Sequence, residues 1–279
     1  MMKFEEGAED IVLELTPWSI VGAAVSGAAH RRDGLDCQDY FTTRQFRTAA
    51  GESLLLVLLA DGAGSASHGL EGAKLACEFI TQRVEDFIAE EVNLNSLNRP
   101  RVGDWFSQLR QRIQNHAELN HQQGRDYATT LSFALITDRE SLPSAVFVQL
   151  GDSTMVYRTD PVWQMAFWPQ RGEYANTTYF VTDEDSHLRF DFITIDQTIT
   201  EVAMITDGLE RLALNHHRKE IHQPFFDDLL ATVRRRAHFG FDLTLSAELA
   251  SYLSSPAITS RCDDDCTIVM ATVRGSHGD

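Results

Sequence analysis

Three apolar segments of this chain run directly into an aspartate that lies beside a glycine. The junctions are residues 54–60 with Asp61-Gly62, residues 146–150 with Gly151-Asp152, and residues 202–206 with Asp207-Gly208. One such junction is ordinary turn chemistry, because Asp and Gly end strands in many folds. Three of them, with the acidic triplet 263–265 before the last apolar run, indicate carboxylates gathered at one rim of a sheet core. Gathered carboxylates need cations.

Composition narrows the class of protein. With 279 residues, 43% of them hydrophobic, the chain can bury a substantial core. Its 41 acidic and 24 basic residues give a formal charge of −17, which argues against nucleic acid or an anionic membrane as the main partner. The acidic N-terminus does not resemble a signal peptide, and no apolar stretch approaches the roughly 20 residues that cross a bilayer. We therefore expect a cytoplasmic protein whose cysteines are free thiols.

The hydrophobic pattern predicts an α+β fold. Strands are expected at 19–27, 54–60, 128–137, 144–157, 202–206 and 266–273, and helices at 71–92, 104–121, 225–237 and 243–253. Residues 93–101, which contain Pro100, are interpreted as a connector. Because strands and helices do not alternate regularly, we expect antiparallel sheets with segregated helices. We expect one domain over 1–279, with its core at about 15–275 and a flap or insert at 159–196.

An aspartate at the end of a buried strand projects past the sheet, and a neighbouring glycine lets a carbonyl point to the same place. Asp61, the Gly62 carbonyl, Asp207 and Asp264 would form an all-oxygen site, which suits Mg²⁺ or Mn²⁺. Cysteine and histidine ligand clusters are absent from the sequence, which disfavours zinc. Two such ions, about 3.5–4 Å apart, can activate a water and clamp an anionic oxygen.

Six short segments together resemble the metal-dependent type 2C protein phosphatases, the PPM family. In order along the chain they are Gln38-Asp39, residues 60–65, Thr129-Thr130, residues 151–153, residues 206–208 and residues 264–267. They span nearly the whole chain in the order and rough spacing of that family. The resemblance implies a four-layer α-β-β-α sandwich with two antiparallel sheets and a binuclear Mn²⁺ or Mg²⁺ centre between sheet loops.

The resemblance also implies roles for individual residues. Asp61 resembles the carboxylate that bridges both metals, with the Gly62 carbonyl on one of them, and Asp207 and Asp264 resemble the other ligands. Asp39 resembles the acid that holds metal-coordinated water, although it could instead only hydrogen-bond its loop. Asp152 resembles a ligand of a third ion, with turn capping as an equal alternative. Thr129 and Thr130 are interpreted as structural strand residues, and Asp263 and Asp265 are expected to face solvent or the turn.

Two positions depart from the family pattern. Gly34 replaces an arginine that binds substrate phosphate in many members, and Ala63 replaces a histidine proposed as general acid in eukaryotic members. Arg31 or Arg32 could bind the phosphate from the same segment, residues 30–34, which is expected to be a polar loop, or could be ordinary solvated charges. His30 and His68 lie near these loops and are candidate proton donors, although most loop histidines have no such role.

The resulting hypothesis is hydrolysis of phosphoserine or phosphothreonine on proteins by a metal-activated water, with Asp39, Asp61, Asp207 and Asp264 as the catalytic residues. One alternative is a weak or inactive member that binds a phosphorylated partner, motivated by Gly34 and Ala63. Another is a two-metal hydrolase of small phosphomonoesters. We expect a monomer that acts on a phosphorylated protein, with a cognate kinase as a further partner and residues 159–196 selecting the substrate.

Overall fold

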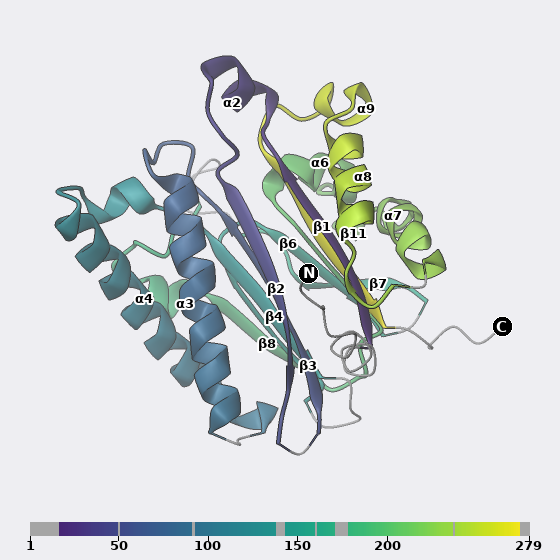
Figure 1. The fold of residues 1–279 in the computed structure, drawn as a ribbon, viewed down its shortest axis with the longest axis horizontal. Coiled ribbons are helices and arrows are strands. Elements are labelled where there is room, and N and C mark those ends of the chain that lie inside the picture. Colours follow the sequence, from purple (N-terminus) through teal and green to yellow (C-terminus); the bar gives the residue numbers. More distant parts are fainter. Residues whose placement is uncertain are drawn as a thin grey trace, which may run out of the picture.

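The computed structural model describes residues 17–49, 51–90, 93–137, 143–159, 161–170, 178–236 and 238–273. Two β-sheets pack face to face, and helices cover the outer face of each one (Figure 1). This is the α-β-β-α sandwich that the family resemblance implied. None of the helices in these ranges combines the length and hydropathy that crossing a bilayer requires.

The first sheet is antiparallel, with the strand order β2-β3-β4-β5-β8. Its strands are β2 (Asp39–Arg47), β3 (Ser53–Asp61), β4 (Leu131–Thr137), β5 (Ala145–Leu150) and β8 (Asp191–Ile195). Helices α3 (Gly69–Ala89) and α4 (Arg99–Leu119) pack on its outer face. In the register of β2 with β3, Asp39 lies directly opposite Asp61, so these two carboxylates share one end of the sheet.

The second sheet has the strand order β12-β1-β13-β9-β6-β7 and is antiparallel except where β12 pairs with β1. Its strands are β1 (Trp18–Val25), β6 (Thr154–Arg158), β7 (Trp163–Phe167), β9 (Glu201–Ile205), β12 (Gly240–Phe241) and β13 (Cys266–Val273). Helices α7 (Gln223–Arg235) and α8 (Leu243–Leu253) cover its outer face. The remaining elements are short: α2 (Ala28–Asp33), η1 (Leu94–Ser96), η2 (Gly124–Tyr127), α5 (Ser186–Arg189), η3 (Asp207–Leu209), α6 (Glu210–Ala213), β10 (Leu214–Asn215), β11 (Glu220–Ile221) and α9 (Pro256–Thr259).

Strand β3 shows why its apolar run does not alternate with polar residues. Side chains on the two faces of a strand alternate along it, and both faces of this strand are buried. The side chains packed between the sheets are Leu55, Val57 and Leu59. Those packed under α3 and α4 are Leu54, Leu56, Leu58 and Ala60. This strand, which lies between β2 and β4, therefore places Asp61 at the rim at the end of a buried segment.

Several expected boundaries are wrong. Residues 30–34, expected to be loop, belong largely to α2, and α4 begins at Arg99 rather than at 104. Pro100 occupies the first turn of α4, where its missing N–H costs nothing, and the Asn98 side chain caps this turn by accepting from the Arg101 N–H at 3.0 Å. The expected strand at 144–157 is two strands, β5 and β6, which belong to different sheets.

The segment 159–196 is in part a structural component of the sandwich. It supplies β7 to the second sheet and β8 to the first, each as an edge strand. Residues 171–177, where a flap would lie, are outside the described residues.

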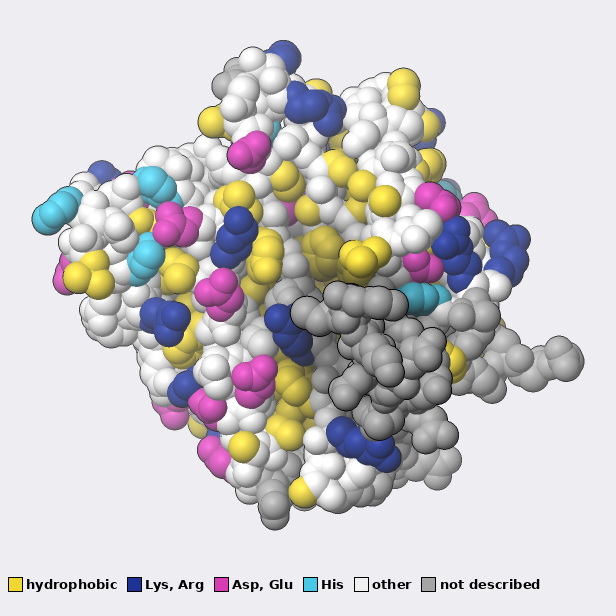
Figure 2. All heavy atoms as spheres, viewed as in Figure 1, with side chains coloured by type: hydrophobic (Ala, Val, Ile, Leu, Met, Phe, Trp, Pro, Cys, Tyr) yellow, Lys and Arg dark blue, Asp and Glu magenta, His cyan; other side chains and the backbone are white. Residues whose placement is uncertain are grey.

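The acidic and basic side chains are interspersed on the face of the molecule shown in Figure 2. This distribution is typical of a solvated protein surface.

Candidate metal centre

Asp39 connects the two sheets at the rim. It is 4% exposed, and its Oδ2 accepts hydrogen bonds from Thr206 Oγ1 at 2.9 Å and Thr267 Oγ1 at 2.7 Å. Thr206 directly follows β9 and Thr267 lies in β13, both strands of the second sheet, whereas Asp39 begins β2 of the first sheet. Its other oxygen, Oδ1, is buried without a hydrogen-bond partner among the described residues. A buried carboxylate oxygen with no donor fits a cation or a water held by one.

Asp61 is held through its backbone, which leaves its carboxylate for the rim. Its N–H donates to Thr130 Oγ1 at 3.0 Å, and its carbonyl accepts from Thr129 Oγ1 at 2.9 Å and the Thr130 N–H at 2.8 Å. The two threonines are therefore structural, as expected, although they precede β4 rather than lie within it. They fix the position of Asp61 relative to its neighbours.

Gly62 follows in a place that only glycine can occupy. A Cβ built there would lie 2.5 Å from the carbonyl carbon of Gly69 and 2.8 Å from the Gln38 carbonyl oxygen. The turn after β3 therefore packs backbone against backbone at the start of α3. This close packing positions the Gly62 carbonyl beside Asp61.

Asp207, Asp152 and Asp264 come to the same region from three other turns. Asp207 begins the short helix η3 directly after β9, and Asp152 follows Gly151, whose φ of +118° makes the sharp turn after β5 possible. Asp264 lies in the turn before β13 and is exposed. A Cβ on Gly208 would be 1.9 Å from the Asp265 carbonyl oxygen, so the turns that carry Asp207 and Asp264 are tightly packed together.

The carboxylates perturb one another strongly. Burial, and then the charges of neighbouring aspartates, raise the pKa of Asp39 to about 7 and that of Asp207 to about 7. Burial with the charges of Asp39, Asp207, Asp152 and Asp264 raises the pKa of Asp61 well above its usual value. Burial also raises the pKa of Asp152. The five predicted acids are thus close enough to repel one another, and divalent cations would relieve this repulsion.

Asp265 corrects one sequence prediction. It was expected to face solvent or the turn, but it is 3% exposed. Its carboxylate accepts from the N–H groups of Gly27 and Gln38, each at 2.7 Å, and contacts His30 Nδ1 at 2.8 Å. Sequence reasoning missed this role because the three partners lie more than 220 residues away along the chain. Asp263, by contrast, is exposed as expected.

Glu210 is a second residue that the sequence analysis missed. Its charge contributes to the raised pKa of Asp152 and of Asp207, and its carboxylate contacts His216 Nε2 at 2.5 Å. A signal was available, because Glu210 follows Asp207 by three residues in a helical turn and so lies on the same side.

The basic residues considered for phosphate binding or proton donation include Arg31, Arg32 and His68. The Arg31 Nη1 donates to the Ser26 carbonyl of its own loop, and both Arg31 and Arg32 are exposed. His68 contacts Gln122 at 2.6 Å and stacks on Tyr127 with a centroid separation of 5.1 Å. These contacts give neither arginine nor His68 a hydrogen bond to the carboxylates of the rim.

The structure also explains the two departures from the family pattern. Gly34 ends α2 with φ +70°, a left-handed conformation that strains other residues, so an arginine at this position would be disfavoured. Ala63 is 7% exposed and packs with Ala66 and Ala128, with Phe180 against this cluster. A histidine at position 63 would have to displace that packing.

Comparison with known proteins agrees with this arrangement. Residues 26–254 match the family described as Protein phosphatase 2C. The chain is 34% identical over 258 residues to serine/threonine-protein phosphatase 3 of Escherichia coli (strain K12), covering 91% of this chain and 98% of that protein. Its fold resembles that of a bacterial serine phosphatase, with a TM-score of 0.61 and 16% sequence identity, over 93% of this chain and 99% of that one. It also resembles the serine/threonine phosphatase Stp1 from Staphylococcus aureus, with a TM-score of 0.59 and 16% identity, over 92% of this chain and 95% of that one. The chain belongs to the protein phosphatase 2C family.

Proposed function

We propose that this protein hydrolyses phosphoserine and phosphothreonine on proteins, using two divalent cations, Mn²⁺ or Mg²⁺, held at the carboxylate rim. The observation that carries the proposal is the buried, unpartnered Oδ1 of Asp39 among aspartates that raise one another's pKa. Family membership and the 34% identity to a serine/threonine-protein phosphatase support the same reaction.

Asp61, the Gly62 carbonyl, Asp207 and Asp264 would hold the two ions, and Asp152 would help to hold a third, weaker one. When bound, such ions lower the pKa of a water and neutralise phosphoryl oxygens, which favours in-line displacement at phosphorus. The residues of the chain set the geometry: Thr206 and Thr267 hold Asp39 Oδ2, so that Oδ1 stays directed to one place. A phosphate-binding role of Arg31 would require its contact with the Ser26 carbonyl to open, whereas Arg32 is exposed.

The substrate-selecting role of 159–196 is part of this proposal. The segment is attached to the rim, because the Gln170 side chain accepts from the Gly151 N–H at 2.8 Å and the Gln170 N–H donates to the Gly151 carbonyl at 3.2 Å. A phosphoprotein bound along this segment would therefore lie beside the turn that carries Asp152. We further propose a cytoplasmic monomer that opposes a cognate protein kinase, because a kinase must supply its phosphorylated substrate.

The test is phosphate release from a phosphoserine peptide by the purified chain in the presence of Mn²⁺, before and after chelation. Asp61→Asn should abolish turnover, since it removes the proposed bridging charge, whereas the matched control Asp263→Asn alters an exposed neighbour and should change it little. Turnover of small aryl phosphates without any on phosphopeptides would favour the small-phosphomonoester alternative. Absent turnover together with absent Mn²⁺ binding would favour a non-enzymatic phosphoprotein-binding role.

A further inference from the structure

The backbone of Gln38 is hydrogen-bonded to two of the turns at the rim. Its N–H donates to Asp265 Oδ2 at 2.7 Å, and its carbonyl accepts from the Gly62 N–H at 3.2 Å. Asp39, the first residue of β2, follows it directly in the chain. Gln38 therefore joins the turn before β13 to the turn after β3, at the point where the chain enters the first sheet.

The Gln38 side chain makes a further contact with the turn after β3. Its amide nitrogen, Nε2, donates to the Ala63 carbonyl at 3.1 Å and to the Gly62 carbonyl at 3.3 Å. The amide takes this orientation because its oxygen, in the same place, would face acceptors only. An amide nitrogen carries two N–H groups, so both hydrogen bonds can form together.

The start of α3 leaves room for this amide. A Cβ at Gly69, the first residue of α3, would lie 2.6 Å from the end of the Gln38 side chain. The amide is thus enclosed between the turn after β3 and the first turn of the helix. This enclosure restricts the positions that the amide can adopt, so that it can fix the direction of the carbonyl groups that it contacts.

The Gly62 carbonyl is a proposed ligand, and its oxygen has two lone pairs. It can therefore accept from Gln38 and still bind a cation. Groups that hydrogen-bond to a metal ligand orient it, and their loss typically weakens metal binding about 10–100-fold. We propose that Gln38 is a positioning residue, which directs the Gly62 carbonyl toward the cation that Asp61 holds. This inference rests on the ligand set proposed above.

The first measurement is nuclear magnetic resonance of the deuterated, metal-free wild-type chain. A scalar coupling across the hydrogen bond should connect Gln38 Nε2 to the carbonyl carbons of Gly62 and Ala63. No coupling to Gly62, in spectra that resolve the backbone couplings between β3 and β4, would overturn the proposal. Added Mg²⁺ should then shift the Gln38 amide resonance, because the cation polarises the carbonyl that this amide contacts.

The second measurement is calorimetric titration of the full-length chain with Mn²⁺. Gln38→Met keeps the length of the side chain without its donors, and it should weaken Mn²⁺ binding about 10-fold or more. Gln223→Met is the matched control, because the Gln223 amide also bonds to backbone: it accepts from the Trp163 N–H at 2.7 Å and donates to the Trp163 carbonyl at 3.1 Å. Its loss should lower stability in urea and leave the Mn²⁺ affinity unchanged.

The outcomes separate this inference from the proposed function. A folded Gln38→Met variant with wild-type Mn²⁺ affinity would contradict the positioning role, and so would a loss of stability without a loss of affinity. If the variant does not fold, the wild type still decides: a Gln38 amide resonance that Mg²⁺ shifts no more than that of Gln223, when Asp61 responds, refutes the proposal. A wild-type chain that binds neither cation would instead contradict the proposed function.

Discussion

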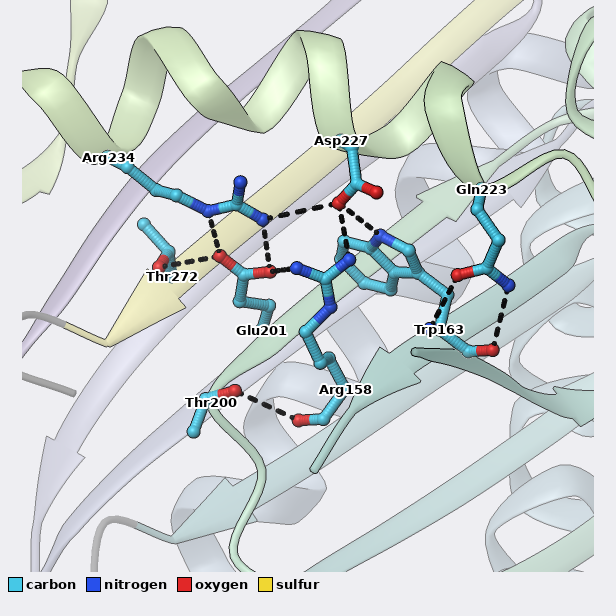
Figure 3. Close-up of polar contacts among 8 residues, drawn as sticks. All are labelled: Arg158, Trp163, Thr200, Glu201, Gln223, Asp227, Arg234 and Thr272. Atoms are coloured by element: carbon cyan, nitrogen blue, oxygen red, sulfur yellow. Dashed lines mark hydrogen bonds and ion pairs between the residues drawn. The ribbon is translucent and has the colours of Figure 1, made fainter. Parts of the chain in front are cut away.

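Replacing Glu201 with glutamine removes one negative charge from a buried ionic network between β9 and α7 (Figure 3). Glu201 is 0% exposed. Its Oε1 accepts from Arg234 Nε at 2.5 Å and Thr272 Oγ1 at 3.2 Å, and its Oε2 accepts from Arg234 Nη2 at 2.6 Å and contacts Arg158 Nη1 at 3.1 Å. Glutamine would keep one acceptor oxygen and would leave two guanidinium groups without this counter-charge.

The size of the effect follows from burial. Removing one partner of a buried ion pair costs about 3–5 kcal/mol, because the remaining charge is desolvated and uncompensated. Arg158 also pairs with Asp227, which is 40% exposed, and Arg234 is itself 22% exposed, so water and a second carboxylate compensate in part. We therefore expect Glu201→Gln to lower the free energy of unfolding by about 3 kcal/mol, the lower end of that range.

Urea denaturation followed by circular dichroism measures this change. Glu90→Gln is the control, because Glu90 pairs with Arg101 at 2.7 Å on the surface, with side chains 51% and 33% exposed, and should cost less than about 1 kcal/mol. Folded Glu201→Gln should retain phosphatase activity, since Glu201 begins β9 and Asp207 follows its other end. If Glu201→Gln lowered the free energy of unfolding no more than Glu90→Gln does, the conclusion that this ionic network stabilises the attachment of α7 to the sheet would be refuted.

Two further predictions concern the rim and the α3 packing. The metal-free protein should lose thermal stability as the pH rises from about 5 to about 8, because Asp39 and Asp207 have a pKa of about 7 when folded and about 3.9 when unfolded. Scanning calorimetry should show this trend, and added Mn²⁺ should reduce it; a melting temperature that rises over this range would contradict the mutual repulsion. Gly72→Ala should destabilise by about 1–3 kcal/mol in urea denaturation, since its Cβ would lie 2.1 Å from the Tyr127 carbonyl oxygen. Gly64→Ala, where a Cβ meets nothing within 4 Å, should show no comparable loss, and equal effects at the two positions would rule out the steric explanation.

The parts of this molecule that could be predicted from sequence are those with local signals. The apolar run 54–60 predicted a strand, and the structure confirms it as β3, whose side chains pack alternately on the two sides of the sheet. The amphipathic periodicity likewise predicted α3 and α8, the latter with its observed boundaries. The gathering of carboxylates followed from one repeated strand-to-turn pattern, because strand ends on one rim bring their turns together.

The unpredicted parts depend on contacts between distant segments. The sequence of 263–265 shows three equivalent aspartates, yet Asp264 is exposed and Asp265 is buried. Only the approach of the segment 27–38 to this turn distinguishes them, since it supplies the donors that offset the burial of Asp265. The edge strands β7 and β8 were obscured for a related reason: their pairing partners, β6 and β5, belong to different sheets.

The turn at Gly34 connects the missing family arginine to the presence of His30. The left-handed conformation of Gly34 lets the chain reverse, so that the Leu35 N–H donates to the His30 carbonyl at 2.9 Å and closes α2. The same short helix holds the His30 ring against Asp265. A residue with a side chain at position 34 would strain this closure. The glycine and the histidine are therefore two parts of one local structure, and the phosphate-binding role of the family arginine cannot be restored at position 34 without disturbing the contact between His30 and Asp265.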